Sequence, residues 1–514
     1  MTAVVSSRRL GLAGLVAGAS GLLAARAVAW AVTGATSPVV AVAASVRDLT
    51  PGGVANFLVH AVKHLDKPLL VAGTVVGVLL ACWGAGMLAR WHRLLPDAVF
   101  GLLAVVGVAA LVQQDEATTG SVVAVLVGLV TMAVVRRFLV GPDVVRVPDP
   151  AGGTVTAPAT GQGRRSFLLG AAGALAVAGL MALGGRALGG GQRAVDQARR
   201  LLRLPVTRGP VPSGADVGVP GIAPWRTPTG SFYVVATALA PPAIDPASWR
   251  LHLHGMVDRP LTLTFDDLVG RRLVEGWVTL CCVSNEVGGD LIGNAWWSGV
   301  PVRDLLASAG VHPSADAVKQ TSADGWTCGT PLPALTDPHR NALLAVAMDG
   351  QPLPIEHGFP VRMVVPGLYG YVSAAKWLVD LEVTRFDRFT AYWTERGWSE
   401  KGPVKTESRI DVPRAGSSVP AGRARVGGVA WAQHTGIERV ELQLDGGPWQ
   451  RASLGRVPNV DTWVQWTGTV SLQPGSHRLV VRATDRSGYT QTAARAGVVP
   501  DGATGWHTVD FTAR

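Results

Sequence analysis

The chain has 514 residues, of which 48% are hydrophobic and only 16% are charged, a composition too apolar for an ordinary soluble protein. Its formal net charge of +10 would suit a nucleic-acid-binding protein, but many arginines stand in pairs beside apolar stretches. Because no run of interleaved basic and aromatic residues occurs, nucleic acid is excluded as an expected partner.

The apolar residues concentrate near the N-terminus. Five stretches stand out, at approximately 10–33, 68–89, 96–114, 119–135 and 167–184. Each approaches the roughly 17–25 residues that a helix needs to cross a bilayer. Residues 1–186 are therefore predicted to form a membrane domain of about five transmembrane helices.

Arginine pairs flank these stretches on one side. Short cytoplasmic loops are enriched in Lys and Arg, so the N-terminus and the loop 137–165 are expected to be cytoplasmic. With five spans, residues 187–514 then lie outside, as part of a multi-pass protein of the inner cell membrane. The alternative is that one weakly apolar stretch lies at the membrane–water interface and does not cross the bilayer. Residues 187–514 would then lie on the cytoplasmic side. The pairs are Arg8 and Arg9, Arg90 and Arg93, Arg136 and Arg137, and Arg164 and Arg165.

The last apolar stretch begins with a distinctive motif. GRRSFLLGAAG combines paired arginines, Ser-Phe-Leu-Leu and a run rich in Gly and Ala. This resembles a twin-arginine export signal placed inside the chain, and that route carries proteins already folded around a cofactor. The two arginines also suit the cytoplasmic end of any membrane helix, so both interpretations stay open.

The pattern changes after the last span. Residues 187–230 are rich in Pro, Gly and Arg without a strong period, which predicts a surface linker. From residue 231, WRLHLHGMV alternates like a half-buried strand, and VPVRDLLASAG has the form of a short helix that ends at Gly310. Residues 231–404 are therefore predicted to form an α+β domain.

The tail, residues 405–514, has the pattern of an all-β domain. IERVELQLDGGPWQ places Val440, Leu442 and Leu444 on one face before an Asp-Gly-Gly turn, which is a strong hairpin signal. HRLVVRATDRSG repeats the pattern. Several short strands at this spacing predict an immunoglobulin-like sandwich.

Two of the four cysteines, Cys281 and Cys282, are adjacent in TLCCVSN. Three interpretations compete: buried structural thiols, a strained vicinal disulfide, or a thiolate ligand for a soft metal. A zinc site is not expected, because only Cys328 remains in this part of the chain and no paired Cys or His spacing accompanies it. A single thiolate on a metal needs its other ligands from elsewhere, for instance from a cofactor.

TLCCVSN resembles the sulfite oxidase family of molybdenum enzymes, in which Thr-Leu-x-Cys-x-x-Asn supplies the cysteine that binds molybdenum. Two further stretches match in the same order, AWWSGVPVRDLL and MDGQPLPIEHGFPVRMVVPGLYGYVSAAKW. The second is similar to the family's Asn/Asp-Gly-x-Pro-Leu-Pro, His-Gly-x-Pro-x-Arg, Val-Pro-Gly and Lys-Trp motifs. The β-rich tail is similar to the family's dimerisation domain, so the resemblance covers roughly residues 230–514.

The resemblance implies a membrane-anchored bacterial member of this family. Its fold class would be N-terminal transmembrane helices, then an α+β sulfite-oxidase-type molybdopterin domain (231–404), then an all-β immunoglobulin-like sandwich of the dimerisation type (405–514). A second copy of the chain is then an expected partner.

The resemblance also implies a cofactor, Mo-molybdopterin. Cys282 maps to the catalytic cysteine that binds the metal, and Cys281 stands at the variable position before it. A guanidinium and an ammonium suit the cofactor's phosphate, and an imidazole suits the pterin edge. Besides Cys282, the implied cofactor-binding residues are Asn285, His357, Arg362, Ser373 and Lys376.

The chain departs from the family at its substrate arginines. The segment FYVVATALAPPAIDPASW has no arginine where the family has Phe-x-x-Arg-Asn-His, and LYGYVSAA is neutral where the family has another. Sulfite is therefore not the expected substrate. A neutral oxygen donor or acceptor is expected instead, unless Arg226 or Arg396 restores the positive charge of the substrate pocket. Further candidate pocket residues are Asp324, Trp326, Tyr369 and Tyr371, with Asp324 better explained as a turn former.

The chain has no Cys-x-x-Cys-His motif for haem attachment, so an external electron carrier or a quinone is expected as its redox partner. The leading hypothesis is a membrane-anchored oxidoreductase that transfers oxygen atoms outside the cytoplasm. The alternative is a non-catalytic surface protein that keeps the fold as a binding or scaffold module. The missing arginines favour the alternative, and the intact cysteine motif favours the enzyme.

Overall fold

The computed structural model describes residues 7–32, 36–50, 66–114, 117–140, 144–148, 154–158, 164–188 and 190–514. The chain divides into two compact units, one of residues 1–197 and 238–243 and one of residues 198–237 and 244–514. The predicted cytoplasmic N-terminus and loop 137–165 fall partly outside the described residues.

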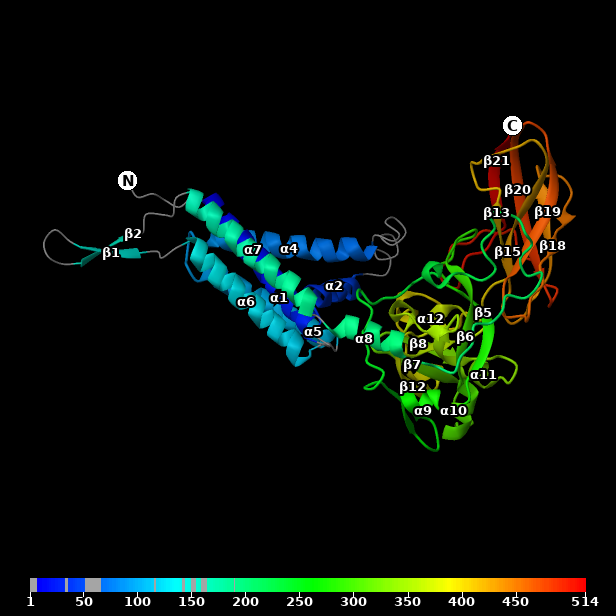
Figure 1. Cartoon of the computed structure of the whole chain (residues 1–514), viewed down its shortest axis with the longest axis horizontal. Coiled ribbons are helices and arrows are strands. Elements are labelled where there is room, and N and C mark those ends of the chain that lie inside the picture. Colours follow the sequence, from blue (N-terminus) through cyan, green and yellow to red (C-terminus); the bar gives the residue numbers. More distant parts are fainter. Residues whose placement is uncertain are drawn as a thin grey trace. The chain divides into compact units, whose positions relative to one another are not determined.

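The first unit is mainly helical (Figure 1). Five of its described helices contain stretches long and apolar enough to cross a membrane, namely Arg8–Ala31, Lys67–Leu88, Leu95–Gln113, Thr119–Val140 and Arg165–Gly184. These overlap the five predicted stretches. The elements are α1 (Ser7–Ala31), α2 (Pro38–Leu49), α4 (Asp66–Leu88), α5 (Leu95–Gln113), α6 (Thr119–Val140), β1 (Val144–Pro148), β2 (Thr154–Pro158) and α7 (Arg164–Leu188), after which α8 (Gly190–Leu201) begins.

Helix α1 packs against α4, α6 and α7 through small residues. A Cβ at Gly14 would overlap the carbonyl oxygen of Cys82 in α4, so only glycine permits this approach. Arg136 near the end of α6 is only 6% exposed, and its Nη2 lies 3.0 Å from Asp97 Oδ1 at the start of α5. Pairing of this kind offsets the cost of a buried charge.

The second unit begins with an α+β domain built on one antiparallel sheet and one mixed sheet. One has the order β10-β9-β6-β5, with β11 also paired to β9, and the other has the order β4-β3-β12-β7-β8. Their strands are β3 (Arg250–Gly255), β4 (Leu261–Thr264), β5 (Val274–Cys281), β6 (Ile292–Pro301), β7 (Ala317–Ser322), β8 (Thr327–Pro331), β9 (Leu343–Met348), β10 (Gln351–Pro352), β11 (Arg362–Val364) and β12 (Leu378–Thr384).

Short helices connect these strands. The predicted helix ending at Gly310 is α10, and Gly310 terminates it with a left-handed φ of 71°. Helix α9 starts with a capping box, in which Thr264 Oγ1 accepts from the Asp267 backbone N–H at 3.0 Å. The helices are η2 (Thr229–Ser231), α9 (Phe265–Val269), α10 (Val302–Ala309), α11 (Leu332–Thr336), η3 (Ile355–His357), α12 (Gly370–Ser373), η4 (Phe386–Arg388) and η5 (Thr394–Arg396).

The tail forms two more sheets, ordered β13-β15-β19-β18 and β14-β21-β20-β16-β17. Inward-facing residues of both, such as Trp466 and Leu479, share one hydrophobic core. The predicted strands are confirmed as β16 and β20. The strands are β13 (Glu407–Val412), β14 (Ser418–Val419), β15 (Gly422–Trp431), β16 (Ile437–Leu444), β17 (Gln450–Arg451), β18 (Ser453–Leu454), β19 (Val464–Leu472), β20 (Gly475–Asp485) and β21 (His507–Ala513).

The segment predicted as a linker is more structured than its composition suggested. It contains α8, and further on Trp225 is only 2% exposed, with its ring 4.8 Å from that of Trp277. The Trp225 carbonyl accepts from Asn294 Nδ2 at 3.0 Å and from Trp463 Nε1 at 2.8 Å. One linker residue therefore joins the α+β domain to the tail sheets.

Candidate functional site

The cysteine pair lies at the end of strand β5. Cys281 is 1% exposed and packs in the hydrophobic core, whereas Cys282, the next residue, is partly exposed. Successive side chains of an extended chain point to opposite sides, which explains the contrast. All four cysteines of the chain are free, so the pair forms no disulfide, and only Cys282 is open to a ligand.

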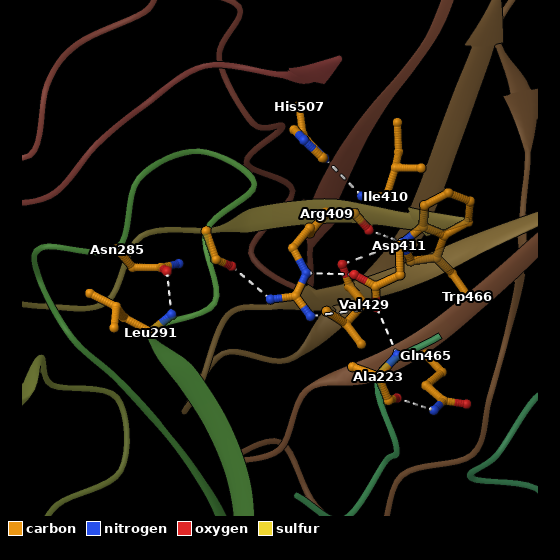
Figure 2. A network of polar contacts seen from close by, with 11 residues as sticks. Ala223, Asn285, Leu291, Arg409, Ile410, Asp411, Val429, Gln465, Trp466 and His507 are labelled. Atoms are coloured by element: carbon orange, nitrogen blue, oxygen red, sulfur yellow. Dashed lines mark hydrogen bonds and ion pairs between the residues drawn. The ribbon is translucent and has the colours of Figure 1, made fainter. Parts of the chain in front are cut away.

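The loop after Cys282 folds back on it. The Cys282 N–H donates to the Leu291 carbonyl at 2.9 Å, and the Asn285 N–H donates to the Cys282 carbonyl at 3.1 Å. The Asn285 side chain, 3% exposed, accepts from the Leu291 N–H through Oδ1 at 2.8 Å (Figure 2). Its Nδ2 is buried and has no hydrogen-bond partner within the described parts of the chain. A buried amide donor is thus left available beside Cys282.

His357, Arg362 and Lys376 come together around one glycine. Gly358, with φ +108°, follows η3, and a Cβ there would lie 3.0 Å from the Cβ atoms of both Arg362 and Lys376. Arg362 Nη1 donates to the His357 carbonyl at 3.2 Å, and Lys376 Nζ donates to the Glu356 carbonyl at 3.1 Å. Only glycine allows this approach at that φ.

Electrostatics link this group to Cys282. Burial, with the nearby charges of Arg362 and Lys376, lowers the pKa of His357 to about 4, so its imidazole is neutral at pH 7. Burial also lowers the pKa of Arg362 to about 10, which leaves it a cation. Burial raises the pKa of the Cys282 thiol. Hydrogen bonds from Ser284 and the positive charge of Lys376 oppose this rise in pKa. A thiolate here therefore calls for a strong positive partner such as a metal.

Three aromatic residues, Phe232, Tyr233 and Trp297, complete the site, and none of them was predicted as a site residue. The Phe232 ring lies edge-on to His357 at 5.6 Å and to Trp297 at 5.8 Å, and the Arg362 guanidinium lies 5.1 Å from the Trp297 ring centre. Burial raises the pKa of the neighbouring Tyr233, and the charges of Cys282 and Arg362 also act on it. For Phe232 and Tyr233 the available signal was the alignment of this segment with the family's Phe-x-x-Arg motif, and for Trp297 it was the match of AWWSGVPVRDLL.

Ser373 is placed differently from the other predicted residues. It is fully buried, and its hydroxyl donates to the Tyr369 carbonyl at 2.9 Å, within its own helix region. Tyr371 is also engaged, because its hydroxyl donates to the Ser399 carbonyl at 2.7 Å. Asp324 accepts from the Trp326 N–H at 3.4 Å beside Gly325 at φ +79°, as a turn former does.

No cluster of three or more His, Cys, Asp or Glu side chains suited to a metal ion occurs within the ranges that the structure describes. A metal on Cys282 would therefore take its remaining ligands from a cofactor. The site offers such a cofactor one thiol, one guanidinium, one ammonium, one neutral imidazole and one unpartnered amide donor.

Comparison with known proteins identifies the family. The model of the oxidoreductase molybdopterin binding domain matches residues 238–393. The uncharacterized oxidoreductase YuiH of Bacillus subtilis is 34% identical over 181 residues, covering 35% of this chain and 87% of that protein. Mitochondrial sulfite oxidase of Homo sapiens is 32% identical over 273 residues, covering 45% of this chain and 49% of that protein.

Among solved structures, the sulfane dehydrogenase SoxCD from Paracoccus pantotrophus aligns with a TM-score of 0.48 and 24% identity, covering 62% of this chain and 88% of that one. The chain spans about half the length of the mammalian sulfite oxidases that it matches. With its cysteine motif, its domain match and the extent of its similarity to YuiH, the chain belongs to the sulfite oxidase family of molybdopterin-dependent oxidoreductases.

Proposed function

We propose that the chain is a membrane-anchored oxidoreductase that binds Mo-molybdopterin through Cys282 and catalyses oxygen-atom transfer outside the cytoplasm. The observation that carries this proposal is the meeting of an accessible cysteine with two cations, since the Lys376 charge acts on both Cys282 and His357. Arg362 lies against the same histidine.

The residues present fit the cofactor. Molybdopterin carries an anionic phosphate, which a guanidinium and an ammonium bind well. Asn285 Nδ2 is a buried donor without a protein partner, as expected of a group that meets a ligand. His357, neutral at pH 7, both donates and accepts and so suits a pterin edge. Ser373 would contribute only its oxygen lone pairs, because its proton bonds Tyr369.

When bound, the molybdenum supplies oxygen-atom transfer coupled to a two-electron change. The protein would hold the cofactor in place, with Cys282 as the ligand of the metal and Arg362 and Lys376 as the partners of the phosphate. Phe232 and Trp297 pack around His357 and Arg362, which keeps water away from their polar groups. This fixed arrangement is what pre-organises a catalytic site.

We infer that the substrate is a neutral oxide, such as a sulfoxide or N-oxide. Arginine is absent from the Phe232 segment and from LYGYVSAA, where the resemblance to the family would place one. Arg396 is already engaged, because its guanidinium lies 3.7 Å from the Tyr392 ring centre and donates to the Tyr392 carbonyl. Two missing charged hydrogen bonds would weaken binding of sulfite on the order of a hundredfold or more.

Steady-state kinetics with artificial electron carriers test this substrate assignment. Sulfoxides or N-oxides should be turned over more efficiently than sulfite and nitrate. Efficient sulfite turnover at micromolar concentration would show that a cation reaches the pocket by another route.

The proposal includes five membrane spans, an external electron carrier or quinone as redox partner, and a second copy of the chain as a partner of the immunoglobulin-like tail. Five apolar helices and the arginine pairs support the anchoring. Protease added to spheroplasts should digest residues 187–514, whereas protection until lysis would reverse the orientation.

The rival function is a non-catalytic scaffold, favoured by the missing arginines. Metal analysis of the protein, purified from a host that makes molybdopterin, separates the two. About one molybdenum per chain supports the enzyme, and a metal-free protein supports the scaffold.

A further inference from the structure

We infer that Arg409 and His507, both in the tail sheets, position the Cys282 loop from a neighbouring domain. The inference rests on the proposed role of Cys282 as the molybdenum ligand. It assigns the tail a function at the metal site, beyond contact between subunits. Neither residue belongs to a motif that the sequence analysis singled out.

Arg409 is the main contact. It is 8% exposed, lies on β13, and its Nη1 donates to the Gly289 carbonyl at 2.6 Å (Figure 2). Gly289 stands two residues before Leu291, whose N–H and carbonyl bond Asn285 and Cys282. A Cβ at Gly289 would lie 2.6 Å from Asn285 Oδ1, so the residue whose carbonyl accepts from Arg409 packs directly against the asparagine side chain.

The guanidinium is itself held in place. Its Nε donates to Asp411 Oδ1 at 2.7 Å, and Asp411 Oδ2 accepts from the Ala223 N–H at 2.9 Å. The Arg409 carbonyl accepts from Trp466 Nε1 at 3.2 Å. Backbone and side chain are thus both fixed, which a donor must be if it is to position a loop.

His507 supports the same loop from the second tail sheet. Its Nδ1 accepts from the Ile410 N–H at 2.9 Å, and its ring lies against Gly288, where any Cβ would overlap it. Burial, aided by the Arg409 charge, lowers the pKa of His507 to about 4, so the ring is neutral and the acceptor role of Nδ1 is stable at pH 7. Gly288 and Gly289 are thus both held by tail residues.

The inference is tested by hydrogen exchange on the detergent-solubilised full chain, with molybdenum content and the Mo(V) resonance spectrum measured on the same samples. In Arg409→Gln, the amides of 282–291 should exchange at least tenfold faster, and the spectrum should change because the thiolate moves. Arg409→Lys should recover part of both, since an ammonium can still donate to Gly289.

Arg478→Gln is the matched control. Arg478 forms a similar Arg–Asp pair in the same domain, with Nε 2.8 Å from Asp510 Oδ1, but that pair is exposed and on β20 and β21. It should leave loop exchange and spectrum unchanged. Unchanged exchange at 282–291 in Arg409→Gln would overturn the inference.

If Arg409→Gln fails to fold, His507→Asn serves as the second variant. It keeps an acceptor near the Ile410 N–H and removes the ring from Gly288, so faster loop exchange is again expected, and an unchanged loop overturns the inference. The exchange readout does not need the metal. A molybdenum-free protein would defeat the proposed function, yet the effect of Arg409 on the loop would still be measurable.

Discussion

The two halves of the site are held in different ways. The His357–Lys376 half is supported by its own domain, with Arg362 bonded to the His357 carbonyl and Lys376 to that of Glu356. The Cys282 loop is instead held by Arg409 of the tail. One half is self-contained and the other depends on a neighbouring domain. Cys282, the proposed metal ligand, is therefore the part of the site most open to influence from elsewhere in the molecule.

The largest expected effect concerns the cysteines. Cys282→Ser should abolish redox turnover, by at least about a thousandfold, because a hydroxyl does not replace a thiolate on a soft metal. Cys281→Ser should keep most activity, because Cys281 is buried in the hydrophobic core. Turnover and molybdenum content of both variants check this. If only Cys281→Ser lost activity, the metal ligand would be Cys281, and the prediction for Cys282 would be wrong.

A substitution at Gly358 should disrupt the half of the site that contains His357, Arg362 and Lys376. Gly358→Ala places a Cβ 3.0 Å from Arg362 and Lys376 at φ +108°, and we expect a loss of roughly 2–4 kcal/mol in stability or cofactor binding. Cofactor content and the melting temperature of the full chain measure it.

Gly397→Ala provides the control. Gly397 also follows a 3₁₀ helix, at φ +90°, but a Cβ there meets nothing within 4 Å. It should cost only the backbone strain of about 1 kcal/mol and should leave cofactor content intact. Equal losses in the two variants would show that crowding at Gly358 is unimportant.

A smaller effect should come from Glu407, which lies behind the cysteine half. It is 4% exposed, and burial raises its pKa to about 8, with Glu286 of the Cys282 loop adding to the rise and Lys405 opposing it. The folded state thus holds a proton that the unfolded state releases near its ordinary pKa of about 4.3. Stability should therefore fall as pH rises from about 4.3 to about 8, and change no further above that.

Glu407→Gln removes this titration. Relative to the unsubstituted chain, it should flatten the decline of melting temperature between pH 5 and 8, with a gain on the order of 1–3 kcal/mol at pH 8. Glu438→Gln, at an exposed position on β16, is the control and should keep the decline. A parallel pH profile in Glu407→Gln would mean that Glu407 is already ionised in the folded protein.

The sequence predicted the parts of this site that short motifs encode. Cys282, His357, Arg362 and Lys376 stand in ordered motifs, and the structure brings the Lys376 charge within reach of both Cys282 and His357. The α10 helix and the β16 strand were predicted because their periodicity and end signals are local.

What the sequence did not predict depends on contacts between distant segments. Arg409 meets Gly289 across 120 residues, and nothing in ESRIDV marks its arginine as different from a solvated one. Tyr233 was not predicted as a site residue, and its burial near Cys282 and Arg362 comes from tertiary packing. Trp225 lay in a stretch whose Pro and Gly content suggested a surface linker, yet the structure buries it.

Trp225 has a practical consequence for dissecting the protein. Its carbonyl is a shared acceptor for Asn294 and Trp463, and its ring fills the core beside Trp277. A fragment that begins at residue 231 would lack Trp225. The side-chain N–H groups of Asn294 and Trp463 would then be buried without their acceptor or would have to bond water. A fragment that begins near residue 202, after α8, keeps Trp225. The boundary at which a fragment of the second unit can begin is therefore set by one tryptophan, which precedes residue 238, the start of the family match.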